Sequence, residues 1–287
     1  MRLLIFKIFD VHLQFKKYKM IYVDAPTPYY QFENLSKFSD RITHFISTRN
    51  HNGSNRFTIG MNEYLDEAGV NVNREILAAQ FNFKPDSYVF AEQVHGNIVE
   101  FISPEKRGLG AFNRASSLPC SDAMITHHSN ICIVAQAADC VPILFYDPNK
   151  NVIASAHAGW KGTVAKIAGE VIKSYKSLYN SNPEDIIVGI GPSIGPCCYE
   201  VGHEVAEQVK ESFINPNKLL IQNPKYTKPV FNLWEANISA LIEQGVKPEN
   251  IEVAKICTKC NNSEFFSARA GDIGRFGGFI MLKKSDK

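Results

Sequence analysis

The sequence lacks several features that mark large classes of proteins. It has no long run of Lys and Arg, and its formal net charge is only +2, so no nucleic-acid partner is expected. No internal repeat is apparent, and no low-complexity linker divides the 287 residues. Apolar residues make up 45% and charged residues 21%, which is typical of a globular enzyme acting on a small molecule.

The N-terminal stretch is apolar but does not read as a targeting segment. Lys7 and Asp10 interrupt it and no small-residue cleavage site follows, so we expect no signal peptide. It is also too short and too charged to span a bilayer, so no membrane association is expected. Met20 is an alternative functional start. Residues 1–19 would then be a dispensable extension of one domain at residues 20–287.

Cysteine usage indicates a reducing compartment. The number of cysteines is odd and several lie in apolar, strand-like runs, so we expect a cytoplasmic protein without disulfides. The seven residues are Cys120, Cys132, Cys140, Cys197, Cys198, Cys257 and Cys260.

The order of apolar patterns predicts an α+β fold. Strand-like runs and helical periodicities follow each other without regular βαβ alternation, so we expect one large domain of mixed and antiparallel sheets with packed helices. Strands are predicted at 42–47, 88–93, 131–138, 141–146, 152–156, 186–190, 251–256 and 278–282. Helices are predicted within 62–81, over 164–178 as one amphipathic helix, and at 204–213 and 233–244. The stretch 104–119 is predicted to be a loop.

A hairpin brings two reactive side chains together. If Pro148 and Asn149 form the turn tip, Asp147 faces Lys150, and counting back along both strands places Cys140 opposite His157. Directly opposed residues share a face, with Cβ atoms about 4.5–5.5 Å apart. That separation suits either a shared metal ion or a Cys–His ion pair, although an inert buried Cys beside a packed His remains an alternative.

His95 is the third candidate ligand. It lies where a predicted strand ends and precedes Gly96, which permits close approach of other groups. Two His and one Cys would leave one open position on a tetrahedral zinc ion, which is the catalytic arrangement. Nothing local forces His95 toward Cys140, so this step depends on the fold.

The sequence contains five ordered blocks: QVHGN, SDAMIT, AADCVPIL, SAHAGWKG and GIGPSIGPCCYEVG. They resemble the signature blocks of the laccase-domain, or YfiH-type, family, also labelled peptidoglycan editing factor and multicopper polyphenol oxidase. The similarity spans about residues 42–282. The resemblance implies a YfiH-like architecture related to cysteine hydrolases. It also implies a zinc site at His95, Cys140 and His157.

The resemblance further implies purine nucleoside phosphorylase activity, with adenosine deaminase activity beside it. Adenosine, inosine, guanosine or methylthioadenosine would react with phosphate, which requires an anion site. Arg49 and Ser47, in the STR segment, match a family block, and the resemblance makes them the first candidates for contact with phosphate or ribose. Arg269 and Arg275 are further candidates that match basic positions of the family less closely. The amino end of the helix after Gly159 could add N–H donors. We expect a monomer.

Three positions depart from the family pattern. Ala138 stands where Thr is common, Lys161 where Arg is usual, and Glu92 where Arg is common. These departures affect the expected substrate preference more than the metal site.

Other potential ligands are interpreted as incidental. Cys257 and Cys260 form a lone CxxC, Cys197 and Cys198 are expected to pack near the site without a redox function, and His127-His128 point opposite ways on an extended chain. Only eight His are present and none is in a His-x-His pattern, so a multicopper centre is not expected.

Two other functions remain open. Cys140 could be the nucleophile and His157 the base of a hydrolase acting on peptidoglycan-precursor amide bonds. Alternatively, the chain could be a non-catalytic module that binds zinc or a nucleoside.

Overall fold

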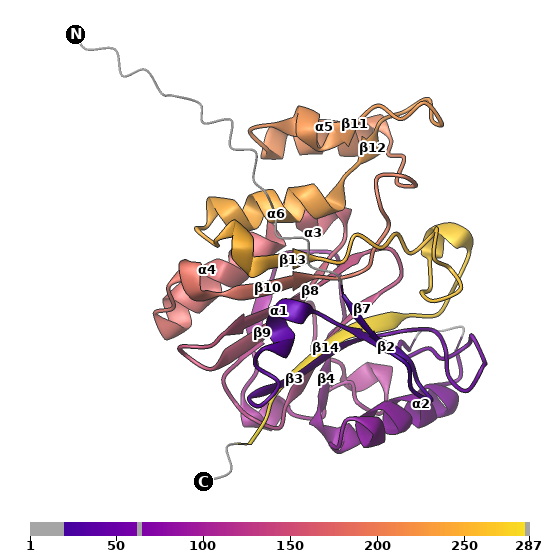
Figure 1. The fold of residues 1–287 in the computed structure, drawn as a ribbon, viewed down its shortest axis with the longest axis vertical. Coiled ribbons are helices and arrows are strands. Elements are labelled where there is room, and N and C mark those ends of the chain that lie inside the picture. Colours follow the sequence, from indigo (N-terminus) through magenta and orange to yellow (C-terminus); the bar gives the residue numbers. More distant parts are fainter. Residues whose placement is uncertain (1–19, 62–64, 285–287) are drawn as a thin grey trace.

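Two six-stranded sheets form the centre of the molecule (Figure 1). The structure is a computed structural model that describes residues 20–61 and 65–284, so the predicted extension at 1–19 lies outside the described residues. The first sheet has the order β1-β2-β3-β14-β7-β4, in which only β4 and β7 pair in parallel. Its strands are β1 (Ile21–Val23), β2 (Tyr29–Gln31), β3 (Ile42–Ser47), β14 (Phe276–Leu282), β7 (Cys132–Ala137) and β4 (Tyr88–Phe90).

The second sheet has the order β13-β10-β8-β9-β6-β5. Its two outer pairs are parallel and the inner pairs antiparallel. Its strands are β13 (Ile251–Val253), β10 (Ile187–Ile190), β8 (Val141–Asp147), β9 (Val152–Ala158), β6 (Ala123–Thr126) and β5 (Val99–Phe101). A separate ribbon pairs β11 (Leu220–Ile221) with β12 (Val230–Phe231).

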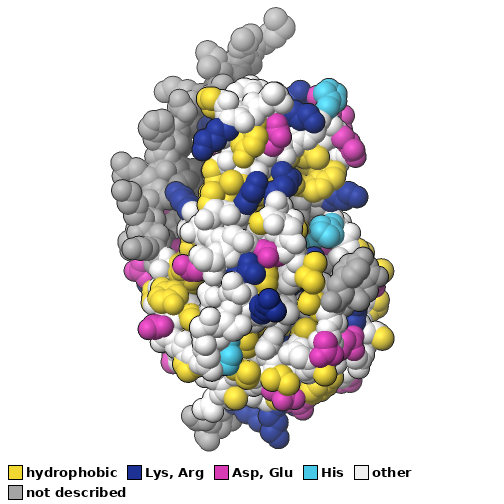
Figure 2. Space-filling view, turned by 90° about the vertical axis from the view of Figure 1, so that its right-hand side faces the viewer, with side chains coloured by type: hydrophobic (Ala, Val, Ile, Leu, Met, Phe, Trp, Pro, Cys, Tyr) yellow, Lys and Arg dark blue, Asp and Glu magenta, His cyan; other side chains and the backbone are white. Residues whose placement is uncertain are grey.

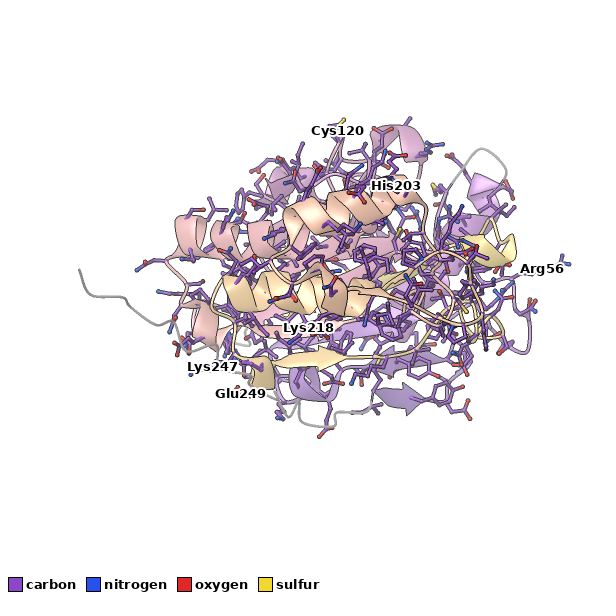
Figure 3. The ribbon with its side chains drawn as sticks, turned by 90° about the horizontal axis from the view of Figure 1, so that it is seen from above. Arg56, Cys120, His203, Lys218, Lys247 and Glu249 are labelled. Atoms are coloured by element: carbon purple, nitrogen blue, oxygen red, sulfur yellow. The ribbon has the colours of Figure 1, made fainter. Side chains whose placement is uncertain are left out.

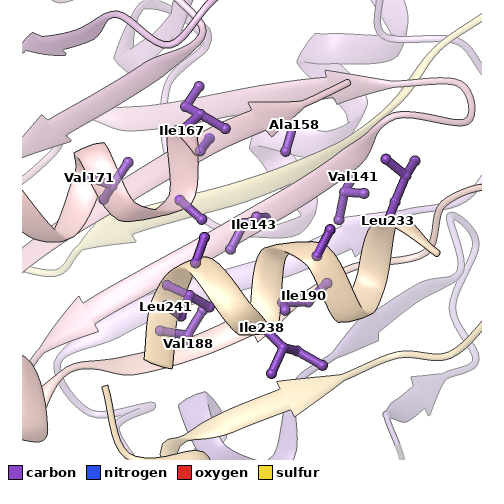
Figure 4. Close-up of a cluster of buried hydrophobic side chains, with 14 of the residues drawn as sticks. Val141, Ile143, Ala158, Ile167, Val171, Val188, Ile190, Leu233, Ile238 and Leu241 are labelled. Atoms are coloured by element: carbon purple, nitrogen blue, oxygen red, sulfur yellow. The ribbon is translucent and has the colours of Figure 1, made fainter. Parts of the chain in front are cut away.

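Helices cover the outer faces of both sheets, which gives four layers (Figure 1). Leu77 and Ala78 of α2 (Glu67–Gln80) share a core cluster with Phe45 and Phe279 of the first sheet. On the second sheet, α4 (Ile167–Tyr179) and α6 (Leu233–Glu243) pack over the strands (Figure 4). Within residues 20–61 and 65–284, the remaining α-helices are α1 (Glu33–Ser36), α3 (Trp160–Val164) and α5 (His203–Ser212).

Alternation along β8 and β9 decides which side chains face the layer between the sheets. Ile143 and Phe145 belong to the cluster under the helices, whereas Leu144 and Tyr146 belong to the cluster between the sheets. Because strand side chains alternate with period two, Cys140 and His157 both fall on the side between the sheets.

The predicted α+β class is confirmed, with one correction in the helices. The periodic segment after Gly159 is two helices, not one, because Lys166 adopts a left-handed conformation (φ 58°) between α3 and α4. A helix of only five residues follows Gly159, so a long helix dipole does not support the expected anion site. The predicted loop at 104–119 is irregular apart from short 3₁₀ turns at Pro104–Lys106 and Arg114–Ser116.

The predicted register of the hairpin is wrong by two residues. Asp147 pairs with Val152 and Pro142 pairs with His157, so four residues connect the strands rather than two. The Asp147 carboxylate accepts hydrogen bonds from the backbone of Asn149 and Lys150, and Asn151 takes the left-handed conformation (φ 52°) that closes this longer turn. A shift of two preserves the face, so Cys140 and His157 are diagonal neighbours.

One face of the molecule carries side chains of both charges. On the face drawn in Figure 2, basic and acidic side chains are interspersed with hydrophobic and uncharged ones. Among the described residues, no helix is long and apolar enough to cross a membrane.

His44 makes the stability of this fold depend on pH. Its Nε2 accepts a hydrogen bond from the Phe32 backbone N–H (3.0 Å), and burial lowers the pKa of His44 from 6.5 to about 4. The unfolded chain binds a proton below pH 6.5, whereas the folded chain does not until about pH 4. The contribution of neutral His44 to the free energy of unfolding is therefore fully present above pH 6.5. It is lost as the pH falls toward 4, by up to about 3 kcal/mol.

The variant His44→Gln should show a flatter pH profile, because its amide oxygen can accept the same hydrogen bond but does not titrate. Urea unfolding of both proteins across this pH window measures the difference in unfolding free energy. Parallel profiles for the two proteins would contradict the assignment.

Candidate metal and catalytic site

His95, Cys140 and His157 meet at one point. One ligand atom from each lies within 4.8 Å of those of the other two, a spacing that could hold a metal ion. The two imidazole rings lie edge to face, with centroids 4.9 Å apart. Nothing in the local sequence brings His95 to the hairpin. The tertiary fold does so.

Gly159 leaves the space that the cluster needs. A Cβ atom at this position would lie 2.7 Å from Cδ2 of His95 and 3.1 Å from Sγ of Cys140. Gly159 stands opposite Cys140 in the hairpin register, one residue beyond the last pair. The small residue after the AHA segment therefore admits the His95 ring itself.

Hydrogen bonds of Gln93 anchor the loop that carries His95 at its start. The Gln93 side chain forms two hydrogen bonds with the backbone of Gln136. Nε2 of Gln93 donates to the Gln136 carbonyl, and Oε1 of Gln93 accepts from the Gln136 backbone N–H, each at 2.8 Å. His95 adopts a left-handed conformation (φ 64°), which is uncommon for a residue with a side chain. A positive φ fixed by neighbouring contacts is typical of functional sites.

Asp122 ties the three segments together. Its carboxylate accepts hydrogen bonds from the backbone N–H groups of Val94, His95 and Gly96, at 3.2, 3.0 and 2.7 Å. The same carboxylate lies 2.8 Å from Nδ1 of His157, and the Asp122 carbonyl accepts from the His157 backbone N–H. Asp122 directly faces His157 across β6 and β9, and it fixes Nε2 as the ring nitrogen available for a ligand.

The charges within the cluster are mutually stabilised. Removal from water opposes ionisation of the Cys140 thiol, but the two histidines outweigh this and lower its pKa. Burial opposes protonation of His157, but Cys140 and Asp122 outweigh this and raise its pKa. The pKa of Asp122 falls despite burial, because His157 and backbone N–H groups donate to its carboxylate. The cluster therefore favours a thiolate at Cys140, which is the form that binds a metal ion or attacks as a nucleophile.

The cluster opens into a cavity of about 1110 Å³. Four arginines line it: Arg74, Arg114, Arg269 and Arg275. The Arg74 guanidinium is buried over the Phe90 ring and donates to carbonyl oxygens of Ile59, Gly110 and Ala111. Arg269 is exposed and stacks over Tyr199, so its charge is more accessible to a ligand.

Ser47 and Arg49 lie outside the lining of this cavity. The buried Ser47 hydroxyl accepts from the Gly277 backbone N–H. Arg49 pairs with Asp272 at 3.1 Å and lies over the Phe266 ring. These contacts give both residues structural functions, and their contribution to substrate binding stays a prediction. Arg269 and Arg275 are on the cavity wall.

The three departures from the family pattern divide between the cavity and the surface. Ala138 and Glu92 line the cavity, so a missing hydroxyl and a reversed charge both face a ligand there. Lys161 is not among the lining residues and lies beside the ring of Trp160.

The cysteines interpreted as incidental are gathered into a second group. One sulfur atom from each of Cys197, Cys198, Cys257 and Cys260 lies within 4.8 Å of the others. The interpretation of the CxxC as isolated is wrong, because its partner is the vicinal pair rather than a second CxxC. The signal in the sequence was that each pair follows a predicted strand.

Asp122 should control metal affinity. Asp122→Asn replaces one carboxylate oxygen, which accepts N–H hydrogen bonds, by an amide NH₂ group, which cannot accept them. The hydrogen bonds that position His157 and the His95 loop are therefore weakened. We expect a loss of zinc affinity of about 10- to 100-fold, measured by competition with a chelator. Glu92→Gln, which changes a cavity carboxylate outside the cluster, is the control. Equal affinity in Asp122→Asn and the wild type would contradict this function of Asp122.

Known proteins match both the sequence and the fold. A purine nucleoside phosphorylase YlmD of Bacillus subtilis is 37% identical, covering 79% of this chain and 82% of that protein. A purine nucleoside phosphorylase of Bacteroides thetaiotaomicron is 34% identical, covering 88% and 96%. Adenosine deaminase RL5, from an unknown prokaryotic organism, is 32% identical, covering 82% and 91%.

The architecture is also that of a solved protein. The crystal structure of hypothetical protein YfiH from Bacillus licheniformis superposes with a TM-score of 0.84 at 31% identity, covering 91% of this chain and 99% of that one. The family model described as multi-copper polyphenol oxidoreductase laccase matches residues 43–283, which contain every residue of the cluster. The predicted resemblance is confirmed, and the chain belongs to this laccase-domain family.

Proposed function

We propose that this chain is a zinc-dependent purine nucleoside phosphorylase with adenosine deaminase side activity. Two relatives that cover most of the chain are named purine nucleoside phosphorylases, and a third is named an adenosine deaminase. The observation that carries the proposal is the His95–Cys140–His157 cluster at the wall of a cavity with arginines. In this reaction, phosphate attacks C1′ of the nucleoside, the glycosidic bond breaks, and the purine and ribose-1-phosphate are released.

The donor set suits zinc. Two imidazole nitrogens and one thiolate are zinc ligands, and three protein ligands leave one position for water or substrate. Asp122 supplies the carboxylate that typically orients a metal-bound histidine. A zinc ion bound here would act as a Lewis acid that stabilises negative charge on the leaving base or activates water for deamination.

The rest of the chemistry belongs to the cavity wall. A volume of about 1110 Å³ is at the upper end of small-molecule sites and accommodates a nucleoside together with phosphate. Arg269 and Arg275 supply positive charge that binds phosphate and holds it for attack at C1′. Both stand in the wall that also contains Cys140, so the anion and the cluster share one space.

Product analysis tests the reaction. Pure protein incubated with inosine and phosphate should yield hypoxanthine and ribose-1-phosphate, and no base should be released when phosphate is omitted. Base release without phosphate would instead indicate hydrolysis. Tight nucleoside binding without turnover would indicate a binding module.

Cys140→Ala should lose the zinc ion of the His95–Cys140–His157 cluster, one per chain, together with phosphorolysis, because it removes the only thiolate of that cluster. Metal analysis and ribose-1-phosphate formation measure the two losses. Cys120→Ala, which changes an exposed cysteine at the periphery of the molecule, is the matched control (Figure 3). Undiminished turnover in Cys140→Ala that has lost this zinc ion would reject the zinc mechanism.

Arg269→Ala should raise the KM for phosphate about 10- to 100-fold, as expected for loss of a hydrogen bond to a charged group. The KM for the nucleoside should change much less, and Arg269→Lys should restore part of the phosphate affinity. The KM for phosphate of Arg49→Ala should be measured beside it. The family resemblance favours Arg49 as the phosphate contact, whereas its position on the cavity wall favours Arg269. Arg56→Ala, at an exposed arginine outside the cavity lining, is the control (Figure 3). Equal effects on both substrates would remove the phosphate assignment.

A Cys–His hydrolase is the second candidate, and two observations favour it. The lowered pKa of Cys140 and the Asp122–His157 hydrogen bond resemble a nucleophile, base and orienting carboxylate. Chelation separates the two, because attack by a thiolate requires no metal.

We also propose that the chain acts in the cytoplasm as a monomer. Every one of its seven cysteines is free, including four whose sulfur atoms lie close together, and such thiols persist in a reducing compartment.

A further inference from the structure

Four cysteines from two distant segments converge beside the second sheet. Cys197 and Cys198 lie in the turn that follows β10, and Cys257 and Cys260 lie in the turn that follows β13. These two strands are parallel neighbours, so their carboxyl ends deliver both turns to the same edge. A further bridge between Ser193 and Cys257 joins the two turns directly.

The spacing of the sulfur atoms matches four thiolates around one ion. Sγ of Cys260 lies 3.6 Å from that of Cys197 and 3.4 Å from that of Cys198. A Zn–S bond of about 2.3 Å places tetrahedral sulfur ligands about 3.8 Å apart, whereas a disulfide requires about 2.05 Å. The observed separations are within a few tenths of an ångström of the tetrahedral value.

Packing alone is a poor account of the group. A thiol is a weak hydrogen-bond donor and acceptor, so four of them gain little from one another. Cys197 and Cys260 are exposed, so the group is not simply part of the apolar core. Tetrahedral sites with four sulfur ligands hold zinc or iron, and a closed set of four protein ligands is typical of structural zinc.

We propose that Cys197, Cys198, Cys257 and Cys260 form a structural zinc site, separate from the His95–Cys140–His157 cluster. The ion clasps the turn after β10 to the turn after β13. This zinc site is independent of the proposed phosphorylase activity, since it requires neither nucleoside nor phosphate.

The clasp positions the residue before Cys140. Asp139 adopts a left-handed conformation (φ 85°) and is held by both turns that carry the four cysteines. Its carbonyl accepts from the Ile194 backbone N–H at 2.9 Å, and its carboxylate accepts from the Thr258 hydroxyl at 2.6 Å. Its other carboxylate oxygen accepts from the Arg269 backbone N–H at 2.7 Å. Loss of the clasp therefore loosens both Cys140 and the arginine assigned to phosphate.

Metal stoichiometry tests the proposal. Protein purified with reductant and without chelator should lose one zinc per chain, relative to the wild type, in Cys260→Ser. The matched Cys120→Ser should lose none. Made in the Cys140→Ala background, which lacks a ligand of the first cluster, Cys260→Ser should still remove one zinc per chain, so a failure here is distinct from a failure of the proposed function. Unchanged zinc content in Cys260→Ser, or iron in place of zinc, would overturn the proposal.

Spectroscopy on the unaltered protein covers the case in which Cys260→Ser does not fold. X-ray absorption at the zinc edge should show sulfur-rich coordination, with an average of more than one sulfur ligand per zinc. Cobalt substitution should give the charge-transfer bands of a tetrahedral tetrathiolate, and Cys120→Ser should give the same spectra. Coordination by one sulfur per zinc, or a disulfide among these cysteines in freshly reduced protein, would also overturn the proposal.

Discussion

The carboxylate of Asp122 is the constraint on which the site depends. It is buried, and a buried charge is tolerated only when donors surround it. Here the donors are the backbone N–H groups of residues 94–96 and the imidazole of His157, which belong to separate segments. The need to satisfy this charge therefore draws the His95 loop onto β9. Removing the carboxylate would leave several donors without a partner and the two histidines of the cluster without a fixed orientation.

Much of the site followed from periodicity alone. Side chains alternate along a strand, so any even error in the hairpin register leaves Cys140 and His157 on one face. The predicted register was wrong by two because the turn chemistry of Asp147 and Asn151 supports a four-residue connection. The conclusion survived because it required only parity. The predicted direct opposition of Cys140 and His157 was itself wrong, since Pro142 is the residue that faces His157.

The remaining features depend on contacts between distant segments. Asp122 was visible only as the acid of the SDAMIT block, with no function assigned to it, and its partners lie 26 to 35 positions away. The break at Lys166 is a left-handed residue inside an otherwise unbroken helical period, so periodicity could not reveal it. The four cysteines meet only because β10 and β13 are parallel neighbours. Likewise, Arg49 matched a sequence block but turns to Asp272, away from the cavity.

The ligand inventory separates this chemistry from the copper oxidation in the family's description. Among the described residues, the potential metal ligands form one group of two imidazoles with one thiolate and one group of four thiolates. The first can leave a position open at a cavity, whereas the second is complete without substrate. Asp139 joins the two, because the turns that carry the four cysteines hold it immediately before Cys140. In the proposed arrangement, the closed four-cysteine site stiffens the support of the open catalytic site, and this requires no electron transfer between the two.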